Sequence, residues 1–222
     1  MKNNLDFTPI DITTWERGGH FWYFSQMAPT GYSITVDIDV TNLKNTLKSN
    51  NISFYPAYLW LVTKALNEHK EFKISQKDGK IGYFASLCPL YAIFHRDNKT
   101  FSLMWTEYSD DFREFYKAYS VNKEKYSQNK GILAQTDKTP PENAYTVSCL
   151  PWIDFKHFAA SFFATCKLDF AQFVICYAFH TGNNHQRASY FLNGTIFLNH
   201  TSSAPFLISS ATSFLISASI SL

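Results

Sequence analysis

The chain has 222 residues, a formal net charge of +2 and only 17% charged residues. This low content of charged residues argues against a disordered chain. The Lys and Arg residues are scattered along the sequence, which argues against binding to nucleic acid or to a membrane surface. With 45% hydrophobic and 18% aromatic residues, the sequence can build a substantial core, and its length suits a single domain over residues 1–222.

Alternating apolar and polar residues predict the first strand, over residues 33–40. Thr41 is expected to be the N-cap of a short helix that follows this strand. Pro56 suits the first turn of the next helix, expected over residues 57–68, because a proline there removes no intrahelical hydrogen bond.

A meander of strands is expected over residues 72–92, where the sequence Lys77-Asp78-Gly79-Lys80 predicts a hairpin turn. Another strand is expected over residues 100–106. Ser109-Asp110-Asp111 then predicts the start of a helix, because carboxylates stabilise the positive end of the helix dipole. Aromatic residues follow at helical spacing and are interpreted as a core stripe: Phe112, Phe115, Tyr116 and Tyr119.

Residues 128–143 are polar and contain Pro140-Pro141, so they predict a loop. A strand is expected after it, over residues 145–150. Strands interleaved with about three helices predict a layered domain of the α+β, or mixed α/β, class.

The cysteines and the N-terminus bear on location. No apolar run follows a basic N-terminus, so no signal peptide is predicted. The cysteines lack CxxC pairs and zinc-finger spacing, which favours free thiols in a reducing compartment and predicts no metal site. A cytoplasmic location is therefore expected. The cysteines are Cys88, Cys149, Cys166 and Cys176.

The composition changes near residue 160. Residues 160–222 carry only three charged side chains, and residues 201–222 include eight serines. The hydroxyl groups interrupt this segment too often for a membrane span to be expected. Two explanations remain open: the segment is a divergent, buried part of the same domain, or a disturbed reading frame produced it.

A series of short blocks between residue 10 and about residue 159 resembles the type A chloramphenicol acetyltransferases, in order and in approximate spacing. The blocks include Thr14-Trp15-Glu16-Arg17-Gly18-Gly19-His20-Phe21, Phe54-Tyr55-Pro56-Ala57, Pro89-Leu90-Tyr91-Ala92-Ile93-Phe94-His95 and Ser148-Cys149-Leu150-Pro151-Trp152. This resemblance implies a two-layer sandwich, in which helices back a mixed sheet. It also implies a homotrimer with active sites between neighbouring subunits.

The resemblance implies a reaction as well. The family transfers an acetyl group from acetyl-CoA to a hydroxyl of chloramphenicol, which gives antibiotic resistance. A histidine acts as the general base, and a serine hydroxyl donates to the oxyanion. On this sequence, that serine corresponds to Ser148. The resemblance places the substrate pocket at five positions: Phe24, Thr30, Tyr32, Phe101 and Leu103.

The sequence departs from the family at the histidine signature, in which two adjacent histidines are followed by three residues and then Asp-Gly. Distance from the C-terminus makes His200 the candidate base, with Asn199 in place of the first histidine and Ala204 in place of the aspartate. The arginine that pairs with this aspartate corresponds to Gly18. Two hypotheses follow: a chloramphenicol O-acetyltransferase, or a catalytically impaired homologue that binds drug or coenzyme without turnover. Under the second hypothesis, His200 has no catalytic role and is only a polar residue in the divergent segment 160–222.

Overall fold

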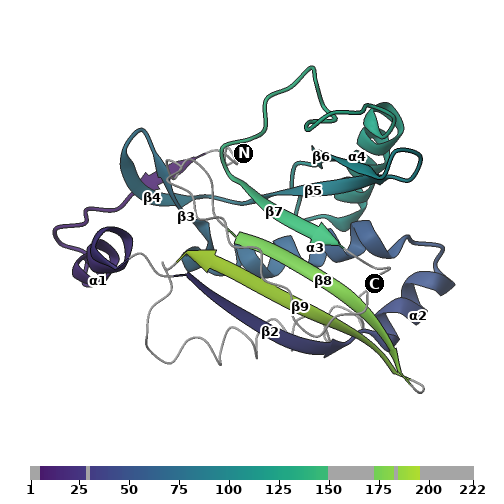
Figure 1. Ribbon diagram of the computed structural model, residues 1–222, viewed down its shortest axis with the longest axis horizontal. Helices are drawn as coiled ribbons and strands as arrows, with labels where there is room; N and C mark the ends of the chain where they lie inside the picture. Colours follow the sequence, from purple (N-terminus) through teal and green to yellow (C-terminus); the bar gives the residue numbers. More distant parts are fainter. Residues whose placement is uncertain (1–5, 29–30, 150–172, 183–184, 196–222) are drawn as a thin grey trace.

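The computed structural model describes residues 6–28, 31–149, 173–182 and 185–195 (Figure 1). The elements are β1 (Phe7–Pro9), α1 (Gly18–Trp22), η1 (Tyr23–Met27), β2 (Gly31–Asp39), α2 (Thr41–Ser49), α3 (Phe54–Asn67), η2 (Lys70–Lys73), β3 (Ile74–Lys77), β4 (Lys80–Phe84), β5 (Cys88–His95), β6 (Thr100–Trp105), α4 (Phe112–Tyr126), β7 (Ala144–Cys149), β8 (Phe173–Gly182) and β9 (His185–Thr195). Among these, no helix has the length and apolar character needed to cross a membrane.

A six-stranded sheet in the order β2-β9-β8-β7-β5-β6 forms the main layer. β7 pairs in parallel with both β5 and β8, whereas the other neighbours in this sheet pair antiparallel. A smaller sheet, β1-β4-β3, lies beside it (Figure 1). The combination of helices with a mixed sheet confirms the predicted α+β class.

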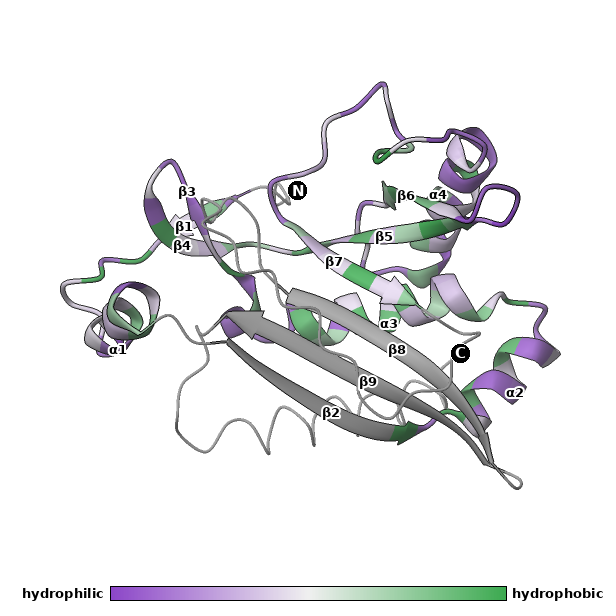
Figure 2. Ribbon diagram, viewed as in Figure 1, coloured by the Kyte–Doolittle hydropathy of each residue, from purple (hydrophilic) through white to green (hydrophobic). Residues whose placement is uncertain are grey.

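Helix α3 forms the centre of the core. Pro56 lies in its first turn, as predicted, although the helix begins earlier than expected, at Phe54. Residues on almost every side of α3 are buried, because the sheet covers one side and α4 packs against another. Figure 2 shows hydrophobic residues along α3, β5 and β7, and mostly hydrophilic residues on α2.

The prediction that Thr41 caps α2 is wrong. Val40 occupies the N-cap position, and its side chain makes no capping hydrogen bond. Instead, the backbone N–H of Thr41 donates to Oδ1 of Asp39 at 2.9 Å. A carboxylate is a strong acceptor for the unpaired N–H groups at a helix start, so the last residue of β2 stabilises the helix that follows.

The predicted hairpin turn is confirmed between β3 and β4. Asp78 and Gly79 have φ angles of 51° and 74°, as expected when both central residues of a two-residue hairpin turn are left-handed. The helix predicted after residue 111 is confirmed as well. The Asp111 carboxylate accepts a hydrogen bond from the N–H of Arg113 at 2.7 Å, and Phe115 and Tyr119 of the aromatic stripe are buried.

The loop after α4 covers the outer edge of β6. The N–H of Leu103 donates to the carbonyl of Ile132, and the carbonyl of Leu103 accepts from the N–H of Ala134. The buried Gln135 side chain accepts a further hydrogen bond from the N–H of Trp105 at 2.8 Å. These bonds satisfy backbone groups that an edge strand otherwise leaves open to pairing with another chain.

Candidate active site

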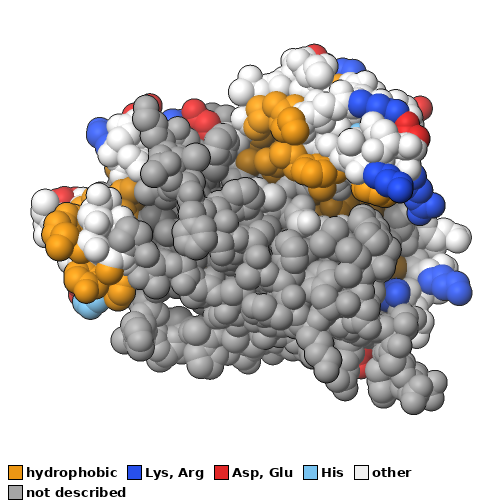
Figure 3. Space-filling model, in the orientation of Figure 1, with side chains coloured by type: hydrophobic (Ala, Val, Ile, Leu, Met, Phe, Trp, Pro, Cys, Tyr) orange, Lys and Arg blue, Asp and Glu red, His pale blue; other side chains and the backbone are white. Residues whose placement is uncertain are grey.

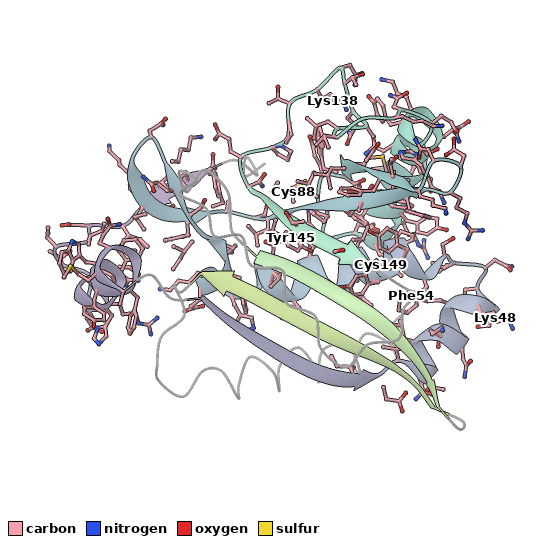
Figure 4. All side chains as sticks on the ribbon, in the orientation of Figure 1. Lys48, Phe54, Cys88, Lys138, Tyr145 and Cys149 are labelled. Carbon is pink, nitrogen blue, oxygen red and sulfur yellow. The ribbon has the colours of Figure 1, made fainter. Side chains whose placement is uncertain are left out.

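Ser148 lies near the end of β7, on the side of the sheet that faces away from α3. Tyr145 and Val147 are buried, and the Tyr145 hydroxyl is 2.7 Å from Oγ1 of Thr63 on α3. Figure 4 shows Tyr145 and Cys149 along β7. Because side chains alternate along a strand, Thr146 and the half-buried Ser148 point to the opposite side.

Residues of β5 and β6 lie on the same side of the sheet as Ser148. Leu90 of β5 pairs with Thr146, and Ala92 of β5 pairs with Leu103 of β6. Paired residues share one side of a sheet, as do every second residues along a strand. We call this surface the Ser148 face. Its described members include Leu90, Ala92, Phe94, Phe101, Leu103, Trp105, Thr146 and Ser148.

The Ser148 face exposes large apolar side chains. Phe94 is 42% exposed and Phe101 is 53% exposed, while the neighbouring Ile132 is 70% exposed. Figure 3 shows hydrophobic side chains gathered at the upper right of the visible surface, in the region where Figure 1 places β5 and β6. An apolar surface of this kind beside a serine hydroxyl suits an aromatic ligand that carries a reacting polar group.

The structure brings together some of the site residues predicted from the sequence. Phe101 and Leu103 share the Ser148 face. Phe24 does not, because η1 continues directly from α1, which lies at the opposite end of the molecule from β6 (Figure 1). Tyr32 belongs to β2, where its backbone is paired with Gly194 of β9. Thr30 and His200 lie outside the described residues, as does the side chain of Tyr32.

The sequence prediction missed other members of this surface, among them Leu90, Ala92, Phe94, Trp105 and Thr146. β5 is apolar on both sides of the sheet, so its sequence has no alternation that marks which residues face α3. Only the register with β6 and β7 separates Leu90 and Ala92 from the buried Tyr91 between them.

No histidine with a described side chain lies on the Ser148 face. His20 belongs to α1, and His69 follows α3. His95 is buried on the opposite side of β5, where its Nε2 is 2.8 Å from Oγ of Ser102. The same Ser102 hydroxyl donates to the carbonyl of Asn129, so His95 is the donor in this pair. Within the described ranges, no three His, Cys, Asp or Glu side chains form a metal-binding group.

Buried tyrosines fill the layer between the Ser148 strand and the helices. Burial raises the pKa values of Tyr55, Tyr91 and Tyr145, and it raises the pKa of Tyr119 to about 12. The Tyr91 hydroxyl lies 2.8 Å from Oγ1 of Thr106. These phenols therefore remain protonated at neutral pH and act as neutral hydrogen-bonding groups.

These pKa values predict how stability changes at high pH. An unfolded tyrosine ionises near pH 10, whereas the folded chain resists ionisation until a higher pH. The stabilisation is therefore complete below about pH 10 and is lost as the pH rises through the folded value, about 12 for Tyr119. We expect tyrosinate absorbance and loss of circular dichroism to rise together in this range. Gradual ionisation near pH 10 in a chain that stays folded would contradict the prediction.

Comparisons with known proteins identify the family of this chain. The sequence profile described as chloramphenicol acetyltransferase matches residues 5–165. A chloramphenicol acetyltransferase from Vibrio anguillarum is 38% identical over 155 residues, which are 69% of each chain. One from Escherichia coli is 39% identical over 157 residues, which are 71% of this chain and 70% of the relative.

The chain belongs to the chloramphenicol acetyltransferase family. A solved structure named chloramphenicol acetyltransferase is similar with a TM-score of 0.81, covering 95% of this chain and 100% of that chain at 19% identity. The cubic core of the pyruvate dehydrogenase multienzyme complex is similar with a TM-score of 0.61, covering 97% and 99% at 12% identity. These likenesses confirm the two-layer fold expected for a chloramphenicol acetyltransferase. The family profile ends close to the composition change near residue 160.

Proposed function

We propose that the chain is a chloramphenicol O-acetyltransferase, which transfers the acetyl group of acetyl-CoA to a hydroxyl of chloramphenicol. The observation that carries this proposal is the half-buried Ser148 on an exposed apolar surface, in a chain of this family. The family's action on chloramphenicol, with acetyl-CoA as co-substrate, supports the choice of both substrates. Antibiotic resistance and a cytoplasmic location follow as parts of the same proposal.

The reaction requires a base and an oxyanion donor. The base removes the proton from the drug hydroxyl, and the resulting oxygen attacks the thioester carbonyl. The Ser148 hydroxyl donates to the oxyanion that forms. Collapse of this intermediate breaks the carbon–sulfur bond, and the base returns its proton to the departing thiolate. We assign the base to His200, because it lies at about the distance from the C-terminus at which the family has its catalytic histidine.

We assign the drug pocket to Phe101 and Leu103 on the Ser148 face, together with Phe24, Thr30 and Tyr32. Exposed aromatic and aliphatic side chains suit a nitrophenyl ring, and hydroxyls at Thr30 and Tyr32 suit the polar groups of the drug. Phe24 follows α1, which lies at the opposite end of the chain from β6 and its Phe101 (Figure 1), and this separation supports a pocket shared between subunits.

A homotrimer is the proposed assembly. Trp22, Tyr23 and Met27 are 55%, 50% and 63% exposed near one end of the chain, and the Ser148 face exposes Phe94 and Phe101 elsewhere. Two different apolar surfaces suit a head-to-tail contact, which closes into a ring when the rotation permits. We expect sedimentation at micromolar concentration to give a trimer. A stable monomer of 25.6 kDa would contradict the proposal.

We also propose a single domain over residues 1–222, because β8 and β9 pair into the same sheet as β2 and β7. The segment after residue 159 is divergent or arises from a disturbed frame. Sequencing the coding DNA distinguishes the two. A one-base shift that restores two histidines and Asp-Gly identifies a frame change.

The missing histidine signature favours a second candidate, an impaired homologue that binds without turnover. Acetyl-CoA consumption in the presence of chloramphenicol tests the enzyme, with the same mixture lacking the drug as the control. Calorimetry with chloramphenicol alone tests binding. Heat without turnover supports the second candidate. The absence of turnover, together with the absence of heat from either chloramphenicol or acetyl-CoA, would contradict both candidates.

A further inference from the structure

Tyr55 lies beneath the strand that neighbours Ser148, on the α3 side of the sheet. It belongs to the first turn of α3, and its hydroxyl donates to the backbone carbonyl of Ala92 on β5 at 3.4 Å. Its ring also meets Tyr91 of β5 edge to face, with a centroid separation of 5.9 Å, and Tyr119 of α4 at 6.5 Å. Tyr55 therefore joins both helices to the middle of β5.

Ala92 and Cys149 lie close to the backbone of Ser148, which also follows Val147 in β7 and pairs with Cys176 of β8. Tyr91 pairs with Val147, the residue before Ser148, and Ala92 follows Tyr91 at the point where the pairing of β5 with β7 ends. Cys149 follows Ser148 in the chain and packs against the same core as Tyr55.

We propose that Tyr55 is a positioning residue for Ser148, acting through the backbone of Ala92 and Cys149 from the opposite side of the sheet. This inference rests on the proposed acetyl transfer. An oxyanion donor stabilises the transition state only when its hydroxyl is held within a fraction of an ångström of the productive position. On the α3 side, the Tyr55 hydroxyl donates to the backbone carbonyl of Ala92, and Tyr55 packs against the same core as Cys149.

The Tyr55 hydroxyl can perform this role at any pH at which the chain is folded. Burial holds its pKa well above the usual value, so it remains a proton donor through the neutral range. Loss of the hydroxyl should therefore lower turnover by the same factor across that range. A change in the shape of the pH profile would instead indicate that Tyr55 takes part in proton transfer.

The first test compares Tyr55→Phe with Tyr119→Phe, each of which removes one hydroxyl from the same aromatic cluster and keeps the ring. We expect Tyr55→Phe to lower kcat about tenfold, with KM for both substrates unchanged. Tyr119→Phe should retain wild-type kcat, and both variants should unfold at similar temperatures. Equal kcat in the two variants, or a change confined to KM, would overturn the proposal.

A double variant tests whether Tyr55 acts through Ser148. In the Ser148→Ala background, Tyr55→Phe should cause no further loss of kcat, because the hydroxyl it positions is already absent. If the double variant instead loses kcat by the product of the two single factors, Tyr55 acts independently of Ser148 and the inference is overturned.

Hydrogen exchange provides a measurement that needs no turnover. We expect backbone amides in peptides covering residues 88–95 and 144–149 to exchange several-fold faster in Tyr55→Phe than in Tyr119→Phe. If the wild-type chain is inactive, the proposed function fails but this comparison still decides the positioning role. Equal exchange rates in the two variants would overturn it.

Discussion

Replacing Ser148 with alanine is expected to lower turnover by about 10²–10³-fold, while affinity for chloramphenicol stays nearly constant. The hydroxyl lies on the exposed apolar side of β7, where it can donate to an oxyanion without having to hold the bound drug. Its contribution therefore belongs to the transition state and should appear in kcat. Steady-state kinetics and calorimetry with the drug measure the two quantities separately.

Ser120→Ala is a matched control for this experiment. It also deletes a single serine hydroxyl, but from the exposed surface of α4, where the hydroxyl donates to the carbonyl of Tyr116. Wild-type kinetics are expected for this control. A Ser148→Ala variant with weaker drug binding and intact turnover would assign Ser148 to the pocket wall instead of to oxyanion stabilisation.

Replacing His200 with alanine is expected to lower turnover by about 10²–10⁴-fold if the chain is an active enzyme, because a general base contributes on that scale. Histidine is suited to this role, since its unperturbed pKa lets it accept and return a proton near neutral pH. The tail has no nearby carboxylate to orient the imidazole, so wild-type turnover should already be low. The measurement is acetylation of chloramphenicol by both chains.

His69→Gln serves as the control, because His69 lies between α3 and η2, away from the Ser148 face. It should keep wild-type turnover. Equal rates for the wild-type chain and His200→Ala, whether both are active or both inactive, would remove His200 from the mechanism. Only two inactive chains would favour the impaired homologue.

Features set by neighbouring residues could be predicted from the sequence. Asp78-Gly79 predicts its own hairpin, because both residues tolerate a left-handed backbone. Asp111 predicts the start of α4 in the same way, from a side chain that reaches a backbone N–H two residues ahead. Thr41 shows where such local reasoning fails, because the competing acceptor on Asp39 lay inside the predicted strand.

Features set by distant pairing could not be predicted in this way. The sequence does not show that the hairpin of β3 and β4 joins β1 in a sheet of its own. The same distinction applies to the residues of the candidate site. Ser148 was found from the family resemblance, whereas Ala92 and Tyr55 emerge only from the strand register and a contact between α3 and β5.

The pairing of β2 has a consequence for folding during synthesis. β2 lies at the end of the large sheet, and its neighbour there is β9, with Gly31 opposite Thr195. The ribosome must therefore synthesise the chain as far as β9 before β2 can pair with its neighbour in the sheet. Until then, the nascent chain carries an unpaired strand, and such edges promote aggregation. Pauses in translation or chaperones that shield the early segment should raise the yield of folded chain, and the high contact order predicts slow folding.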